Sequence, residues 1–368
     1  MYNHSCLLLQ YYSREKKNMK ILFFINRLYG GGAERVASIL LNHFSKKHDT
    51  YVAVTDLKGP TYHINNLVHL INNQIQIKVK GAGRIPGFVK MIQLINEIKP
   101  DMIISFLTRT NNNAIFANLF FQKKIIVSER NTLNRVSSKT QKYLRKLLYP
   151  HTSKIVFVTT EDLKSFKLPQ KSITIYNPAI FEPYSNYENR GKSIITIAPT
   201  DRWYNKGLDI LVSVWGRIAP QYHDWNLEIY GKYNESDLPD TITQHNERIS
   251  WKGWNHNIAE VLRTKSIFIL ASRFEGCPNS LIEAMSQGCA CIGTDCEGGI
   301  KEIITDGIDG VIAKNDDVDD IANKLQMLID DETLRRKLSA GAIEKVKQFD
   351  KNAFFAKWDN LLEEVAGK

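Results

Sequence analysis

Long apolar runs are missing from this sequence of 368 residues, and no stretch approaches the 18 or so apolar residues of a membrane-spanning helix. The first 18 residues hold only a three-leucine apolar core, which is too short for a secretory signal. Because the strand-like "KILFFI" follows Met19 directly, we expect residues 1–18 to be an extension outside the fold. The apolar share of 43% and charged share of 24% indicate a soluble globular protein, long enough for two domains.

Cysteine is scarce, and its spacing does not fit a metal site. Four of the five cysteines lie between Cys277 and Cys296, without the paired CxxC spacing or the histidine partners of a zinc site. Their odd number also disfavours a disulfide framework, so we expect reduced, packed thiols in a cytoplasmic protein. The nine histidines form no HExxH motif, and "DDVDD" (316–320) precedes a predicted helix whose cap would use it. We therefore expect neither a metal nor a cofactor.

Acidic residues are scarce in the first half of the chain. Residues 1–170 contain 26 Lys and Arg against 9 Asp and Glu, a net charge of +17. Residues 171–368 contain 23 against 30, a net charge of −7, and the two halves sum to the overall +10. This asymmetry indicates that the first half faces an anionic partner: a membrane surface, a nucleic acid or a phosphorylated acceptor. Its basic amphipathic segment 137–154 could lie on anionic lipid, or form the solvated outer face of a helix packed on a sheet.

Short apolar, β-branched runs alternate with amphipathic segments of helical length. This alternation predicts two doubly wound α/β domains in tandem, each a parallel sheet covered by helices on both faces. The predicted strands are 21–25, 51–55, 75–79, 102–106, 125–128, 155–159, 194–197, 227–230, 267–270 and 290–293. The predicted helices are 33–46, 88–98, 139–148, 208–218, 279–287, 318–329, 332–348 and 351–364.

The segment 177–193 carries two prolines and little periodicity, and it is the predicted linker. It separates a first domain at 19–176 from a second at 194–350, and we expect the C-terminal helix in 351–368 to cross back to the first domain. Open α/β sheets bind ligands beyond the C-terminal ends of their strands. The expected site is therefore the cleft between the domains.

Two short motifs follow predicted strands and open predicted helices. "NRLYGGGAERV" (26–36) brings three glycines to a helix N-terminus, which favours close approach to an anion, whereas an ordinary tight turn needs only one. It lacks the GxGxxG spacing, although Asp56 keeps a dinucleotide site open as an alternative. "DRWYNKGLDIL" (201–211) offers Arg202 and Lys206 either to a diphosphate or simply to solvent.

A third motif, "SRFEGCPNSLIEAMSQG" (272–288), carries two carboxylates eight residues apart. Asn279 or Ser280 is expected to cap the helix that begins there. Glu275 would then project from the strand end, and Glu283 would lie about one turn into the helix, whose N-terminus stabilises a carboxylate. A loop charge and a helix-dipole contact are the alternatives, but the pair together with its Gly-Pro loop favours a ligand site.

With its continuation "GTDCEGGIKEIITDGIDGVIA", the third motif resembles the family-4 retaining glycosyltransferases of the GT-B fold. The likeness consists of E-x7-E, with Gly-x-Pro after the first Glu and Ala after the second, and then Gly-Gly and "DG..G". "GGAERV" and "KGLDIL" match as well, so the motifs span about residues 19–349. "VSERN" (127–131) and "RWYNKGLD" further resemble bacterial members that build capsule, exopolysaccharide or O-antigen units on a polyprenyl-diphosphate lipid.

The resemblance implies a metal-independent, retaining hexosyl- or N-acetylhexosaminyltransferase at the inner face of the cell membrane. Its donor would be a nucleotide sugar, with UDP expected, and its acceptor a lipid-linked saccharide; no nucleic acid would be involved. Arg202 and Lys206 would hold the leaving diphosphate, Glu275 the sugar hydroxyls, and Glu283 the ribose. The other implied donor contacts are Gly31, Gly32, Gly253, Trp254, Gly276, Cys277, Pro278, Asn279, Ser280 and Leu281.

The chain departs from the family pattern in two places. Thr200–Arg202 replaces the usual Gly-Arg-Leu, which shifts the arginine by one position. Many members have a histidine after the fourth strand, where this chain has "SFLTRTNNN". The implied sugar or acceptor contacts therefore fall to Thr108, Arg109, Asn111 and Arg130. The alternatives are a nucleotide-sugar epimerase of the same architecture, a catalytically degenerate sugar- or membrane-binding subunit, and a dinucleotide oxidoreductase.

Overall fold

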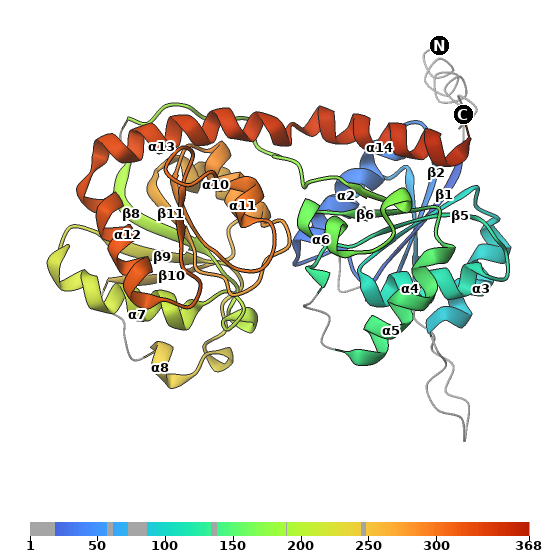
Figure 1. Cartoon of the computed structure of the whole chain (residues 1–368), viewed down its shortest axis with the longest axis horizontal. Helices are drawn as coiled ribbons and strands as arrows, with labels where there is room; N and C mark the ends of the chain where they lie inside the picture. Colours follow the sequence, from blue (N-terminus) through green and yellow to red (C-terminus); the bar gives the residue numbers. More distant parts are fainter. Residues whose placement is uncertain are drawn as a thin grey trace, which may run out of the picture.

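A computed structural model describes residues 19–56, 62–72, 87–133, 138–188, 190–243 and 248–367. They form two parallel sheets, flanked by helices and placed next to each other along the long axis of the molecule (Figure 1). The predicted arrangement of two doubly wound sheets is therefore confirmed. The expected extension 1–18 and the predicted strand 75–79 lie outside the described residues.

The first sheet has the strand order β3-β2-β1-β4-β5-β6-β7, and all its pairs are parallel. Its strands are β1 (Lys20–Ile25), β2 (Asp49–Val54), β3 (Val68–Asn72), β4 (Met102–Phe106), β5 (Lys124–Ser128), β6 (Lys154–Phe157) and β7 (Ser172–Thr174). Its helices are α2 (Gly32–Phe44), α3 (Gly87–Ile98), α4 (Thr108–Asn118), α5 (Lys139–Leu148) and α6 (Thr160–Ser165). The order reverses between β1 and β4, the kind of switch point at which α/β sheets bind ligands.

The second sheet has the order β10-β9-β8-β11-β12-β13, again parallel throughout. Its strands are β8 (Gly191–Ile197), β9 (Asn226–Tyr230), β10 (Ile249–Gly253), β11 (Lys265–Leu270), β12 (Ala290–Thr294) and β13 (Val311–Ala313). The helices that follow are α7 (Leu208–Ile218), α8 (Asp240–Thr243), α9 (Ile258–Arg263), α10 (Asn279–Ser286), α11 (Ile300–Ile303), α12 (Val318–Asp330), α13 (Glu332–Lys345) and α14 (Lys351–Ala366). Its switch point lies between β8 and β11.

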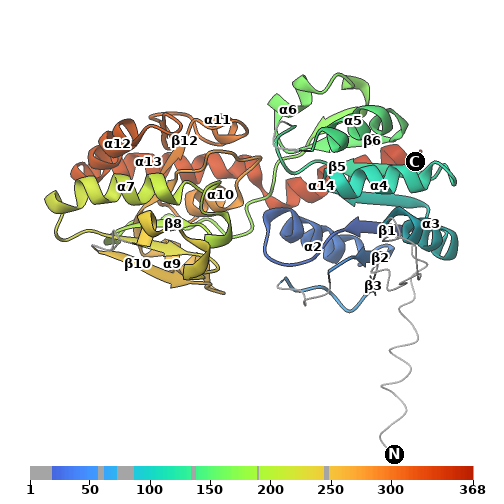
Figure 2. The same ribbon diagram turned by 90° about the horizontal axis from the view of Figure 1, so that it is seen from below.

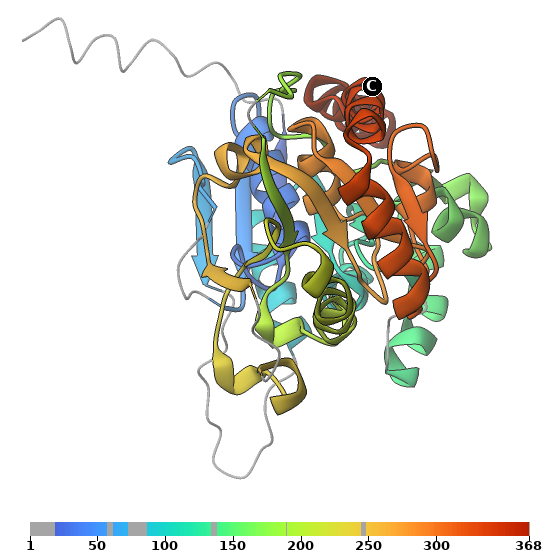
Figure 3. The same ribbon diagram turned by 90° about the vertical axis from the view of Figure 1, so that its left-hand side faces the viewer.

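Alternate residues of each strand face opposite layers of helices. In the first sheet, Phe23 packs with α2 and α14, while Phe24 packs with α3 and α4. In the second sheet, Ile269 packs with α7 and α12, while Phe268 packs with α10 and α11. Figure 3 looks at the second domain from its end and shows helices on both faces of this sheet. Burial of both faces explains why the strands read as nearly continuous apolar runs in the sequence.

The last helix of the chain returns to the first domain. Figures 1 and 2 show α13 along the second domain and α14 continuing over the first. Phe354, Trp358 and Leu361 of α14 are buried in one apolar cluster with Ile21 and Leu40 of the first domain. The helix therefore contributes to the core of a domain that begins more than 300 residues earlier in the sequence.

The sequence does not predict every element. β7 and β13 have three residues each, too few for a periodic signal. Helix α4 is hidden by its three consecutive asparagines, whose side chains compete for backbone hydrogen bonds. In the fold, Asn112 Nδ2 donates to the Gln141 carbonyl at 3.1 Å, and Asn118 Nδ2 donates to the Lys123 carbonyl at 2.8 Å. Tertiary hydrogen bonds thus stabilise a helix that propensity disfavours.

Candidate functional site between the domains

Lys206 and Glu275 form an ion pair beyond the C-terminal ends of β8 and β11. Lys206 Nζ lies 2.6 Å from Glu275 Oε1, and Ser272 Oγ donates to the same oxygen at 2.7 Å. Gly207, next to the lysine, has φ +61, and a Cβ there would lie 2.0 Å from the Ala271 carbonyl oxygen. Only glycine lets the two loops approach this closely. The structure thus brings together two of the three predicted catalytic residues.

Arg273 holds the same two loops together, and sequence reasoning does not single it out. Its guanidinium donates to both carboxylate oxygens of Asp209 at 2.8 Å, to Asp316 Oδ1 at 2.9 Å and to the Tyr204 carbonyl at 2.7 Å. The hydrogen bonds with Asp209 raise the pKa of Arg273. Such a bidentate contact fixes both position and orientation. Arg273 therefore sets the geometry around Lys206 without belonging to the ion pair.

Glu283 is paired across the domain boundary. Arg35 of α2 donates from Nη1 to Glu283 Oε1 of α10 at 2.5 Å, and the Arg35 guanidinium lies over the rings of Tyr62 and Phe181. Burial raises the pKa of Glu283, and the charge of Arg35 acts against that shift. The sequence gives no sign of this contact, because its partners are 248 positions apart.

The N-termini of α2 and α10 meet at the same place, and Figure 2 shows the two helices on facing sides of the domains. A Cβ on Gly32 would lie 2.9 Å from Asn279 Nδ2, and this amide donates to the Gly32 carbonyl at 3.5 Å. Neither helix has a side-chain cap, since Gly31 and Pro278 are the N-cap residues. The expected cap by Asn279 or Ser280 is therefore wrong. The uncapped amides favour an anion between the domains.

Arg202 lies in the turn after β8 and makes no side-chain hydrogen bond or ion pair with the described residues. Burial raises the pKa of Tyr62, and the charges of Arg35, Glu283 and Arg202 all act on it, so Arg202 lies in the neighbourhood of the Arg35–Glu283 pair. Gly253 ends β10 with φ +67, its carbonyl accepts from the Gly231 amide at 2.9 Å, and the indole of Trp254 beyond it is exposed. An exposed ring of this kind suits stacking on a flat ligand group.

Arg130 lies buried where the first domain meets the 276–277 loop. Its Nη1 donates to Asn177 Oδ1 at 2.8 Å, and Asn177 Nδ2 donates to the Cys277 carbonyl at 2.8 Å. A Cβ on Gly276 would lie 2.8 Å from the Arg130 carbonyl oxygen. Burial lowers the pKa of Arg130 to about 9, and its Nε and Nη2 have no hydrogen-bond partner among the described residues. The guanidinium is therefore a buried cation at the domain junction.

Two predicted sugar contacts lie inside the first domain instead. Thr108 donates to Glu129 Oε2 at 2.8 Å, and Asn111, which is fully buried, donates to the Tyr149 hydroxyl at 3.0 Å. Tyr149 donates in turn to the other oxygen of Glu129. Burial raises the pKa of this carboxyl. The network stabilises α4 against β5 and leaves Asn111 no surface for a substrate, whereas Arg109 is exposed.

The run "DDVDD" and the cysteines have structural roles. Asp317 caps α12, as predicted, by accepting from the Asp320 amide at 2.9 Å. Within the described residues, no group of three or more His, Cys, Asp or Glu side chains could hold a metal ion. Burial raises the pKa of Cys277 to about 12, and the four described cysteines are free and buried. Packed thiols rather than disulfides agree with the prediction.

Comparison with known proteins identifies the family of the domain that carries these residues. Residues 191–331, which contain Lys206, Glu275 and Glu283, match the family described as glycosyl transferases group 1. The chain is a glycosyltransferase with a group 1 domain. It is 24% identical, over 94% of its length and 99% of the other protein, to a Campylobacter jejuni GalNAc-alpha-(1->4)-GalNAc-alpha-(1->3)-diNAcBac-PP-undecaprenol alpha-1,4-N-acetyl-D-galactosaminyltransferase.

A second relative agrees with this glycosyltransferase assignment, and a solved structure shares the fold. A second C. jejuni enzyme, the N-acetylgalactosamine-N,N'-diacetylbacillosaminyl-diphospho-undecaprenol 4-alpha-N-acetylgalactosaminyltransferase, is 27% identical over 90% of this chain and 96% of its own. The crystal structure of Anabaena Alr3699/HepE in complex with UDP superimposes with a TM-score of 0.75 at 17% identity, covering 94% of this chain and 100% of that one. This likeness confirms the GT-B fold. None of the transferase's described helices is long and apolar enough to cross a membrane.

Proposed function

We propose that the chain is a retaining glycosyltransferase that moves a sugar from a UDP-linked donor to a polyprenyl-diphosphate-linked saccharide in bacterial cell-surface polysaccharide synthesis. The observation that carries the proposal is the Lys206–Glu275 pair, which lies between the domains beside two uncapped helix N-termini. The donor class is suggested by the UDP complex of the similar structure, and the acceptor class by the diphospho-undecaprenol in the names of the C. jejuni relatives.

The Lys206–Glu275 pair and the Arg35–Glu283 pair would bind different parts of the donor. Lys206 has three N–H donors and uses one on Glu275, so two remain for the diphosphate. Arg202 and the free amides of α10 add positive charge around the same group. Breaking the anomeric bond leaves negative charge on the departing phosphate, and preorganised cations and amides stabilise that charge as it develops. We propose that this protein does so without a metal.

The carboxylates each keep one oxygen for the ligand. Oε1 of Glu275 takes both of its hydrogen bonds, from Lys206 and Ser272, and no described residue donates to Oε2. Glu283 is likewise held through Oε1 by Arg35. The free oxygens are the proposed acceptors for a sugar hydroxyl at Glu275 and a ribose hydroxyl at Glu283. The acceptor hydroxyl would attack on the face from which the phosphate leaves and pass its proton to that phosphate, which retains the configuration.

Arg130 is the proposed cation on the first-domain side of the reacting groups. Its Nε and Nη2 have no hydrogen-bond partner among the described residues, and its backbone carbonyl adjoins Gly276 of the loop that would hold the donor phosphate. A buried donor without a partner is unfavourable by about 1–3 kcal/mol, so binding of an anion or a sugar oxygen there is favoured. Thr108 and Asn111 are left out of the proposal because the Glu129 network occupies them.

The outer face of α4 and α5 is proposed to contact the anionic lipids on the inner face of the cell membrane. Tyr143 and Leu147 of α5 and Phe120 beyond α4 are exposed apolar side chains. Exposed Lys142 and Lys146 lie beside them on α5. Basic residues near an anionic surface contribute about 1 kcal/mol each, and apolar side chains add insertion. This face would bring the cleft to a lipid-linked acceptor.

Two experiments test these proposals. Purified protein is incubated with a panel of nucleotide sugars and a prenyl-diphosphate-linked saccharide, and products are followed by mass spectrometry with and without EDTA. Transfer from a UDP-sugar that EDTA leaves unchanged supports the proposal; conversion of the donor to its epimer without acceptor would support the epimerase instead. Vesicles of phosphatidylglycerol should bind the wild type more tightly than Tyr143→Ser/Leu147→Ser, while Ile308→Ser, an exposed apolar residue of the second domain, serves as the control.

A further inference from the structure

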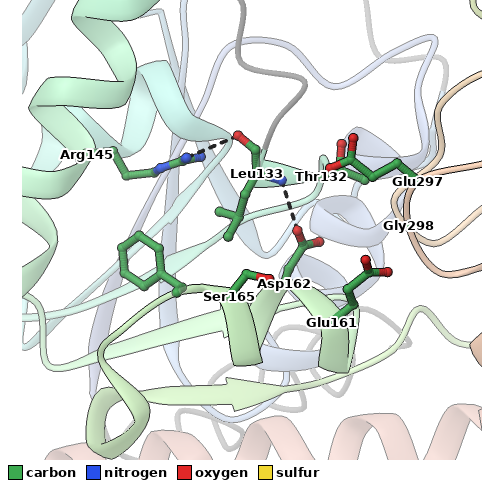
Figure 4. A pocket seen from close by; sticks show the side chains of 9 residues that line it. Thr132, Leu133, Arg145, Glu161, Asp162, Ser165, Glu297 and Gly298 are labelled. Carbon is green, nitrogen blue, oxygen red and sulfur yellow. Dashed lines mark hydrogen bonds between the residues drawn. The ribbon is translucent and has the colours of Figure 1, made fainter.

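A cavity lies at the domain junction, next to the proposed donor site. It is a cavity of about 240 Å³ between α5, α6 and the 297–298 loop that follows β12 (Figure 4). Its wall adjoins the donor loop directly, because a Cβ on Gly298 would lie 1.6 Å from the Glu275 carbonyl oxygen. The Gly299 amide also donates to the Gly276 carbonyl at 2.8 Å. The cavity therefore lies beside the loop that carries Glu275, the residue assigned to the donor sugar.

The charges around this cavity select against phosphate. Three carboxylates, Glu161, Asp162 and Glu297, line it together with one guanidinium, that of Arg145, so its formal charge is −2 near neutral pH. Figure 4 shows the carboxylates on one side and Arg145 on the other. A nucleotide or a diphosphate would meet net repulsion here. Neutral ligands rich in hydroxyl groups would instead donate to the carboxylate oxygens.

Arg145 provides independent evidence for a ligand. The residue is only 8% exposed, and its Nη2 donates to the Leu133 carbonyl at 3.1 Å. Its Nη1 is buried without a hydrogen-bond partner among the described residues. The guanidinium lies over the ring of Phe166, which lines the same cavity. A buried donor without a partner is unfavourable unless something fills the cavity and accepts from it.

We propose that this cavity binds one sugar residue of the saccharide acceptor, a role that rests on the function proposed above. Its volume of about 240 Å³ is below the roughly 300–1,000 Å³ of sites for drug-sized ligands, which fits a single ring better than a nucleotide. Glu161, Asp162 and Glu297 accept from ring hydroxyls, and Arg145 donates to a ring or carbonyl oxygen. The Leu133 amide and the Thr159 hydroxyl fix Asp162 in place, at 2.9 and 2.8 Å.

Filling the cavity tests this proposal. Ser165, at the exposed C-terminal end of α6, lines the cavity, whereas its exposed neighbour Lys164 does not. We expect Ser165→Tyr, which fills the cavity, to raise the KM for a prenyl-diphosphate-linked saccharide at least tenfold. Glu161→Gln should raise this KM roughly tenfold, which corresponds to the loss of one charge-assisted hydrogen bond. Lys164→Tyr should match the wild type. Donor hydrolysis to UDP without acceptor should stay within twofold in all three variants.

A binding experiment separates failure of the cavity from failure of the proposed function. Free glucose, galactose and their N-acetylated forms are titrated into the full chain by NMR, with inorganic phosphate as the charged comparison. The proposed sugar site is supported if the wild type binds a sugar but not phosphate, and if Ser165→Tyr abolishes the sugar binding. This result supports the site even if the protein turns over no nucleotide sugar. If the wild type binds none of these sugars, if Ser165→Tyr binds them equally well, or if its acceptor KM is unchanged, the proposal is overturned.

Discussion

Replacing Arg35 by methionine should destabilise the junction between the domains. The change keeps most of the side-chain stem and removes the cation that lies 2.5 Å from Glu283 Oε1. Removing one partner of a buried ion pair lowers the free energy of unfolding by about 3–5 kcal/mol. Because 23% of the Arg35 side chain is exposed, against 6% for Glu283, we expect a value just below this range, about 2–3 kcal/mol at pH 8.

The pH dependence of this loss follows from Glu283. Burial raises its folded-state pKa above the ordinary value, so between these two values the folded state binds more protons than the unfolded state. Stability contributed by this group is therefore present at low pH and is lost as the pH rises through the folded-state pKa. Removing Arg35 raises that pKa further, because the guanidinium charge lowers it. Arg35→Met should thus be closer to the wild type at pH 5 than at pH 8.

Urea unfolding followed by circular dichroism at both pH values measures the effect. Arg27→Met is the matched control, because Arg27 pairs with Glu34 at 3.1 Å within the first domain and 31% of its side chain is exposed. It should lower the unfolding free energy by at most about 1 kcal/mol. The double variant Arg35→Met/Glu283→Gln, which leaves no buried charge, should recover much of the loss. If Arg35→Met and Arg27→Met behave alike at both pH values, the cross-domain pair contributes nothing and the reasoning is wrong.

Three further predictions concern the loops of the site. Gly298→Ala should lower kcat/KM about tenfold or more, because φ at Gly298 is +123 and the added Cβ would collide with the Glu275 carbonyl. The control Gly216→Ala adds a Cβ in open space and should leave kcat/KM unchanged, so equal rates for the two variants would contradict this packing. Arg273→Lys should lower the unfolding free energy by about 2 kcal/mol through loss of its bidentate contact, and an unchanged urea midpoint would argue against that role. Cys277 should resist iodoacetamide at pH 8 in the native protein, because its pKa is raised to about 12, and peptide mapping that finds it labelled would disprove this.

The elements that the sequence predicts best are those with a strong local pattern. The strand 102–106 and the helices 139–148 and 208–218 appear with the predicted bounds. The first is a continuous apolar run, and the others have one apolar face. Their signals are local, so a single sequence contains them. Helix α4 lacks such a signal, because its buried asparagines are stabilised by residues outside the helix.

The sequence predicts only those parts of the site that lie in recognisable motifs. Lys206 and Glu275 lie in loops that follow predicted strands, and parallel strands bring their C-terminal ends together, so their proximity follows from the pattern. Glu283 is different, because its partner Arg35 comes from the other domain and the contact depends on how the domains meet. The same applies to Arg145, whose lack of a partner appears only once the surrounding side chains are placed.

The most direct test of the account is calorimetric titration of UDP into the wild type and Lys206→Met, with Lys232→Met as the matched control. Lys232 is an exposed lysine of the same domain that lies 3.9 Å from Asp201. If Lys206 binds the diphosphate, its loss removes a charge-assisted hydrogen bond of about 1.5–3 kcal/mol and weakens UDP binding roughly 10- to 150-fold. The control should bind as the wild type does. Equal affinity of Lys206→Met and the wild type for UDP would contradict the assignment of the Lys206–Glu275 pair to the donor.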